Sequence, residues 1–88
     1  MYNWNIKKIE VERGLFLEDS CINFCDTYIG SVEPVGRDLF GNKVWSVSLF
    51  NRVTNEELVC KCVLSAENGR KIIESTIYME EVKRRVQI

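Results

Sequence analysis

The feature that most constrains this chain is the dipeptide Asn68-Gly69, which lies between two stretches rich in β-forming residues. A two-residue hairpin turn of type I′ needs positive φ at both central positions, and Asn-Gly tolerates that conformation. A second, weaker turn is expected at Thr54-Asn55. Together the two turns predict a three-stranded antiparallel meander over residues 43–79.

The register of the meander follows from the alternation of side chains along a strand. Closing the chain at both turns collects the apolar residues on one inner face, whereas a slip of one residue would scatter them. The predicted inner rows are Trp45/Leu64/Ile73, Val47/Cys62/Ser75, Leu49/Cys60/Ile77 and Asn51/Leu58/Met79. The outer face is expected to be polar at its centre and apolar at its ends, with Phe50, Val59 and Tyr78 at one end and Val44 and Ile72 at the other.

A helix is predicted over residues 19–29. Beginning with Cys21, apolar residues occur at i, i+1, i+3, i+4, i+7 and i+8, which is one continuous helical stripe. Asp19 or Ser20 is suited to cap its start, and Gly30 is suited to its end. An N-terminal strand is expected within residues 1–13.

Residues 31–42 are harder to assign. Val32 and Val35 are compatible with an edge strand, since Pro34 lacks a backbone donor, and a loop is expected around Asp38-Leu39-Phe40. The charged tail, residues 80–88, either extends the last strand or turns into a short helix. A rival interpretation makes residues 68–86 one helix. It is disfavoured because Ile73 and Ile77 then lie off the proposed stripe and the segment is rich in β-formers.

The predicted fold class is therefore α+β, with one helix packed on an antiparallel sheet in a single domain spanning residues 1–88. The predicted order of elements is β-α-β-β-β(-β), which cystatin-like and hot-dog-like folds share. This comparison concerns topology only, and topology does not determine function.

The four cysteines are the sharpest chemical feature. Cys21 and Cys25 lie on the stripe of the predicted helix, and Cys60 and Cys62 lie on the predicted inner face of the sheet. Four convergent thiols would suit a structural zinc ion, but the spacings C-x₃-C and C-x-C differ from the usual C-x₂-C. Plain buried thiols are the favoured interpretation, and no cofactor is expected.

Composition excludes several classes of function. The chain has 88 residues, a formal net charge of −1 and no histidine, so it lacks both a general attraction to nucleic acid and the commonest catalytic base. The carboxylates lie in charged, solvated stretches, and no catalytic pair is apparent. No apolar run approaches the length of a membrane span, and the thiols without a signal peptide indicate the cytoplasm.

These observations predict a small non-catalytic module that binds another protein. The module is also expected to form a homodimer. It would act sterically through an exposed sheet face or edge, with the outer-face residues as anchors. Inhibitors and adaptors carried by phages and mobile elements are proteins of this kind. The alternative is a small-molecule binder or enzyme of hot-dog type, which would hold an apolar or acyl ligand between the helix and the sheet.

Overall fold

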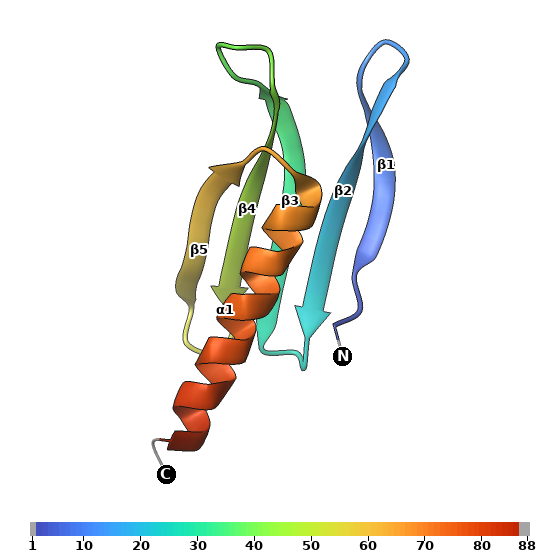
Figure 1. The fold of residues 1–88 in the computed structure, drawn as a ribbon. Coiled ribbons are helices and arrows are strands. Elements are labelled where there is room, and N and C mark those ends of the chain that lie inside the picture. Colours follow the sequence, from blue (N-terminus) through green and yellow to red (C-terminus); the bar gives the residue numbers. More distant parts are fainter. Residues whose placement is uncertain (1, 87–88) are drawn as a thin grey trace.

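The structure, a computed structural model that describes residues 2–86, is a five-stranded antiparallel sheet with one helix across one face (Figure 1). Neighbouring strands in the sheet are also neighbours along the chain, so hairpins join them. The predicted α+β class, one helix on an antiparallel sheet, is confirmed. The elements are β1 (Asn5–Glu12), β2 (Leu15–Phe24), β3 (Tyr28–Arg37), β4 (Lys43–Asn51), β5 (Glu56–Val63) and α1 (Ala66–Val86).

The helix predicted over residues 19–29 is wrong, because this segment forms the end of β2, a tight turn and the start of β3. Ser20 and Ile22 are buried while their neighbours on either side are more exposed, which is the alternation of a strand. Cys25 and Asp26 have φ of 54° and 55°, and these left-handed residues close the hairpin. The one helix follows all five strands, so the order is not β-α-β-β-β(-β).

The third strand of the predicted meander is also wrong, because β5 is followed by α1 and the rival helical interpretation of residues 68–86 is the correct one. Asn68-Gly69 lies in the first turns of this helix and makes no hairpin. Gly69 lets the helix approach the sheet closely: a Cβ there would lie 2.8 Å from Cγ1 of Val32 and 3.0 Å from Cγ2 of Val47. The buried helical residues are Ala66, Gly69, Ile73 and Ile77, which share one stripe.

Both ends of α1 carry suitable polar groups. The hydroxyl of Ser65 accepts a hydrogen bond from the backbone N–H of Asn68 at 3.3 Å, as an N-cap does. Glu67 lies in the first turn and three basic residues lie in the last turn. The helix dipole favours this placement of negative and positive charge. The predicted charged tail, residues 80–88, is therefore helical to Val86, and residues 87 and 88 lie outside the described residues.

The β4–β5 hairpin forms as predicted, but its register is wrong. Asn51 pairs with Glu56 around a four-residue loop, and a bulge near Leu58 then makes Leu49 pair with Val59. The prediction had paired Leu49 with Cys60. On β4 the inner residues are as expected, whereas on β5 every position beyond the bulge points to the opposite face.

The core lies between α1 and the inner face of β2 to β5. The largest side chains that are fully buried come from β3, β4 and the helix: Tyr28, Val32, Val47, Leu49, Ile73 and Ile77. Gly30 of β3 makes room for the helix, since a Cβ there would lie 3.1 Å from two atoms of Ile73. Two layers of apolar side chains thus meet without a gap.

The sheet splits toward the tips of the β1–β2 and β3–β4 hairpins, which extend beyond the start of α1 (Figure 1). Pairing of β2 with β3 ends at Val32, and Pro34, which has no N–H to donate, lies two residues farther along β3. Across the split, Nε of Arg37 lies 2.8 Å from Oε1 of Glu12. The edge strand predicted from Val32 and Pro34 is wrong, since β3 lies at the centre of the sheet.

Candidate interaction surfaces

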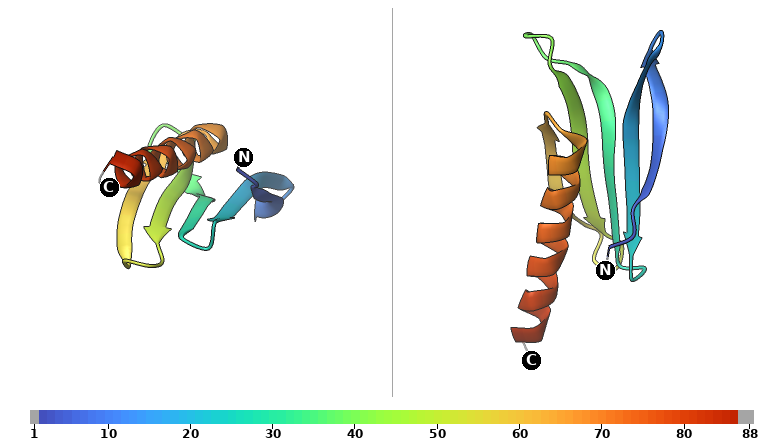
Figure 2. Two further views of the ribbon diagram at one scale, coloured as in Figure 1. Left: turned by 90° about the horizontal axis from the view of Figure 1, so that it is seen from below. Right: turned by 45° about the vertical axis from the view of Figure 1, so that its right-hand side comes forward.

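The outer face of the sheet, opposite α1, carries no second layer within residues 2–86 (Figure 2). Ile29 and Phe50 are direct neighbours on β3 and β4, and both are exposed. Beside them lies a row of small residues, in which the hydroxyls of Ser31 and Ser48 are 2.8 Å apart. Small side chains beside an apolar pair make a flat surface that another protein surface can contact closely.

The charges on this outer face are mainly acidic. Asp19 shares the face with Cys21 and Glu33 with Ser31, because residues two apart on a strand point the same way. Glu57 lies opposite Phe50 on the neighbouring strand. One basic residue, Lys7 of β1, pairs with Asp19. The outer face therefore favours a partner surface that carries positive charge.

The two edges of the sheet are less suited to binding. Free edges attract additional strands unless bulges or inward-pointing charges disrupt them. β5 has a bulge near Leu58 and places Lys61 on the inner face, in one row with Val47. β1 carries two lysines followed by two glutamates and is irregular between Glu10 and Glu12. Of the two predicted modes, face or edge, the geometry favours the face.

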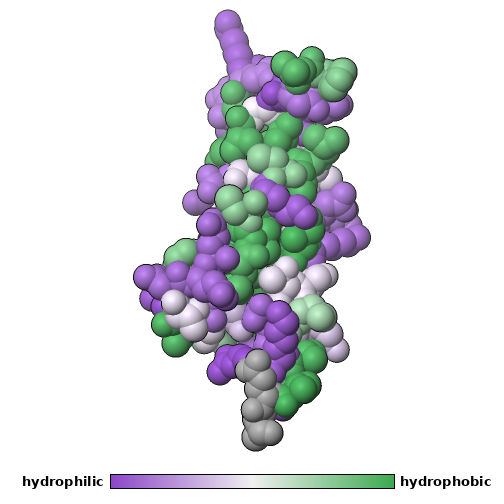
Figure 3. Space-filling model, turned by 90° about the vertical axis from the view of Figure 1, so that its left-hand side faces the viewer, coloured by the Kyte–Doolittle hydropathy of each residue, from purple (hydrophilic) through white to green (hydrophobic). Residues whose placement is uncertain are grey.

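The anchor residues predicted from the sequence do not form one row. Phe50 and Val44 lie on the outer face of β4, as predicted, but Val59 packs toward the core. Ile72 and Tyr78 belong to α1 and not to the sheet. Figure 3, which views the β5 and α1 side, shows a band of apolar side chains flanked by polar ones. Val59 is partly buried on this side, and Ile72 lines a shallow depression with Val63.

The predicted convergence of the four thiols is wrong, and so is the favoured interpretation that they are buried. All four cysteines are exposed free thiols, and Cys21, Cys60 and Cys62 lie on the outer face because of the corrected registers. Cys25 lies in the β2–β3 turn. Within the described part of the chain, no group of three or more Cys, Asp or Glu residues is placed to hold a metal ion. The carboxylate of Glu57 accepts a hydrogen bond from Cys60, and this bond and its charge raise the pKa of that thiol.

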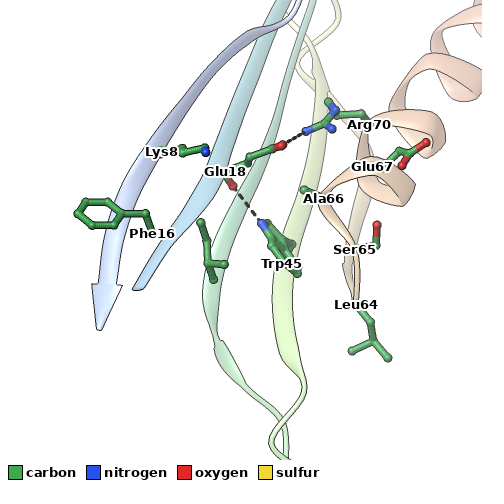
Figure 4. A pocket seen from close by; sticks show the side chains of 10 residues that line it. Lys8, Phe16, Glu18, Trp45, Leu64, Ser65, Ala66, Glu67 and Arg70 are labelled. Carbon is green, nitrogen blue, oxygen red and sulfur yellow. Dashed lines mark hydrogen bonds and ion pairs between the residues drawn. The ribbon is translucent and has the colours of Figure 1, made fainter. Parts of the chain in front are cut away.

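A groove on the inner side lies beside the start of α1, where the helix no longer covers the sheet (Figure 4). It has a volume of about 400 Å³, and Trp45 lies at its centre, with Phe16 on the side of β2 and Leu64 on the side of the helix. The indole N–H of Trp45 donates to the carbonyl oxygen of Glu18 at 3.0 Å. Arg70 donates to the Glu18 carboxylate at 3.2 Å and to the buried Ser20 hydroxyl at 2.9 Å. These bonds fix the floor and one wall of the groove.

The loop between β3 and β4 presents the most exposed apolar side chains near this groove. Leu39 is 100% and Phe40 89% exposed. The sequence predicted the loop but not the exposure of its two large apolar side chains, which lie between Asp38 and Gly41-Asn42. Ile29 was missed because it was assigned to a helix.

The loop has a defined conformation. Oδ1 of Asp38 accepts hydrogen bonds from the N–H groups of Phe40 and Asn42, both at 2.9 Å, and Gly41 takes positive φ, 83°. Arg37 donates to the carbonyl oxygen of Gly41 at 2.9 Å. The hydrogen bonds to Asp38, those from Asn42 foremost, lower the pKa of its carboxyl.

The helix α1 is too polar to cross a membrane, and it is the one helix among residues 2–86. Comparisons with protein-family models, with curated proteins and with solved structures find no match to this chain.

Proposed function

We propose that this chain is a non-catalytic module that binds another protein through the outer face of its sheet. The observation that carries the proposal is the uncovered outer face, with Ile29 and Phe50 exposed side by side and small residues next to them. An uncovered, partly apolar sheet face is the usual setting for a second layer, which here a partner would supply.

The partner's chemistry follows from the charges on the face. Glu57 lies opposite Phe50, and Asp19 and Glu33 lie farther along the same face, so the complementary surface carries lysine or arginine beside an apolar centre. Two copies of this chain packed through the same face would bring like charges together, which is unfavourable. The proposed partner of this face is a different, basic protein surface.

The mechanism is steric: a rigid sheet covers a site on the partner, as an inhibitor or adaptor does.

The alternative, an apolar ligand held between helix and sheet, has little support. Ile73 and Ile77 fill the interface, and the contacts expected for a Cβ at Gly69 show that not even a methyl group fits there. Aromatic residues such as Phe50 are the usual anchors of a protein contact.

The test compares Phe50→Asp, on the outer face, with Val53→Asp, an equally charged change at an exposed position of the β4–β5 loop. A photo-crosslinking amino acid is placed at position 50 or 53 in cells that encode the chain. A discrete adduct with a basic protein is expected from position 50 only. Purified wild-type protein and Val53→Asp should compete with that adduct, and high salt should weaken it, whereas Phe50→Asp should not compete.

Three results would contradict the proposal. One is an adduct of equal strength from both positions. Another is competition by Phe50→Asp as effective as by wild type, with both variants giving the far-ultraviolet circular dichroism of the wild type. The third is an adduct from position 50 that contains only a second copy of this chain.

A further inference from the structure

We propose that two copies of this chain associate through their hairpin ends, with the Leu39-Phe40 loop of each copy inserted into the Trp45 groove of the other. This inference concerns a different surface from the outer face and does not depend on the proposed function. Three observations carry it: an uncovered part of the inner face, a protruding apolar loop beside it, and the amount of surface involved.

The first observation is that α1 is too short to cover the whole inner face. It begins at Ala66, and both long hairpins extend past it as a single layer (Figure 1). A sheet normally buries its apolar face against a second layer. Here the groove around Trp45, with Phe16 and Leu64 at its sides, is where that layer is missing.

The second observation is the loop itself. Leu39 and Phe40 contribute nothing to the core, since both are almost completely exposed. Their backbone is nonetheless fixed by the Asp38 hydrogen bonds and by the 2.9 Å bond from Arg37 to Gly41. A fixed loop loses little entropy on binding, so its apolar side chains are pre-organised as anchors.

Loop and groove lie at the same end of the molecule and on the same side of the sheet. The left view of Figure 2 shows the β3–β4 loop on the side that carries α1. A protrusion and a hollow on one surface are self-complementary under a two-fold axis, because each copy then supplies what the other lacks. The groove of about 400 Å³ has room for the Leu39 and Phe40 side chains.

The third observation is the area. Phe16 is 54% and Leu64 59% exposed, in addition to Leu39 and Phe40. With roughly 150–250 Å² for each fully exposed large side chain, reciprocal packing buries about 1,000 Å² over the two copies. That reaches the lower limit of about 1,000 Å² for specific interfaces, a size typical of weak, reversible association. The flanking charges do not oppose it, since Lys8 and Arg70 accompany Glu18 and Glu67 around the groove.

Sedimentation velocity of the purified full chain, over a micromolar concentration series, tests the dimer. Wild type should pass from monomer to dimer. Phe40→Ser, in the loop, and Leu64→Asp, at the groove, should each weaken the dimer by about tenfold or more. Val53→Asp, at the other end of β4, and Phe50→Asp, on the outer face, should leave it unchanged, which separates this inference from the proposed function.

A mixing experiment tests the reciprocal exchange. In a mixed dimer of Phe40→Ser and Leu64→Asp chains, the intact loop of one chain meets the intact groove of the other. The mixture should therefore associate more strongly than either variant alone. The inference is wrong if wild type stays monomeric throughout, if Phe40→Ser dimerises like wild type, or if the mixture gains nothing. It is also wrong if a photo-crosslinker at position 40 labels a different protein or lipid and not a second copy.

Discussion

Replacing Gly69 by alanine tests the central contact of the fold, between the start of α1 and the sheet. In an exposed helix interior the change from glycine to alanine stabilises by about 1 kcal/mol, because alanine restricts the unfolded chain and suits the helix. At position 69 the added Cβ would lie 2.8 Å from Cγ1 of Val32 and 3.0 Å from Cγ2 of Val47. Carbon atoms in good contact are roughly 3.5–4.0 Å apart, so both contacts are too short.

The strain has no inexpensive release. Val32 and Val47 are fully buried, and β-branched side chains in strands have few alternative rotamers. The helix must instead move outward, which loosens the packing of Ile73 and Ile77 below it. Overpacking costs about 1–3 kcal/mol, and two short contacts with fully buried side chains place this change in the upper part of that range, at about 2–3 kcal/mol. The gain of about 1 kcal/mol in helix propensity offsets part of this cost. We expect a net loss of about 1–2 kcal/mol in the free energy of unfolding.

Urea unfolding followed by circular dichroism measures this loss, together with the melting temperature, which should fall by roughly 5–15 °C for a domain of this size. Ser75→Ala, at an exposed position of the same helix, is the matched control and should change stability by a few tenths of a kcal/mol at most. If Gly69→Ala proves as stable as wild type, or about 1 kcal/mol more stable, the close approach of α1 to the sheet is refuted.

Three further predictions concern polar groups. Arg70→Ala leaves the buried hydroxyl of Ser20 without its 2.9 Å partner and should lower the free energy of unfolding in urea by about 1–3 kcal/mol. Adding Ser20→Ala should recover part of that loss, and no recovery would contradict the role of the bond. Glu57→Gln should lower the pKa of Cys60 and speed its alkylation by iodoacetamide at mildly alkaline pH, whereas an unchanged rate would remove Glu57 as the cause of the raised pKa. The pKa of Asp38 is lowered below 3.8, so its stabilisation of the loop is complete above that value and is lost as the pH falls through the lower folded pKa. Amide chemical shifts of the loop should follow this acid transition, and Asp38→Ala should abolish it.

The sequence by itself was sufficient for features that depend on short-range pattern. The N-terminal strand, the inner residues Trp45, Val47 and Leu49 of β4, and the loop at Asp38-Leu39-Phe40 were all predicted. Each follows from alternation or from turn-forming residues, which act over a few positions. The α+β class followed as well, because any arrangement of one amphipathic helix and several strands must bury two apolar faces against each other.

Only the tertiary structure decided where the helix lies. Residues 19–29 and residues 68–86 each satisfy both a strand pattern and a helix pattern. Hydrophobic periodicity favoured the wrong choice in the first segment, and β propensity favoured the wrong choice in the second. Packing decides between them: Gly69 fits directly against Val32 and Val47, and Ile73 against Gly30, and these contacts join residues more than 20 positions apart. The bulge near Leu58, which moves Cys60 and Cys62 to the outer face, is likewise settled by pairing with β4. The local sequence is compatible with more than one secondary structure, and long-range contacts determine which one forms. The reason is that the free energy of burial exceeds propensity differences of a few tenths of a kcal/mol per residue.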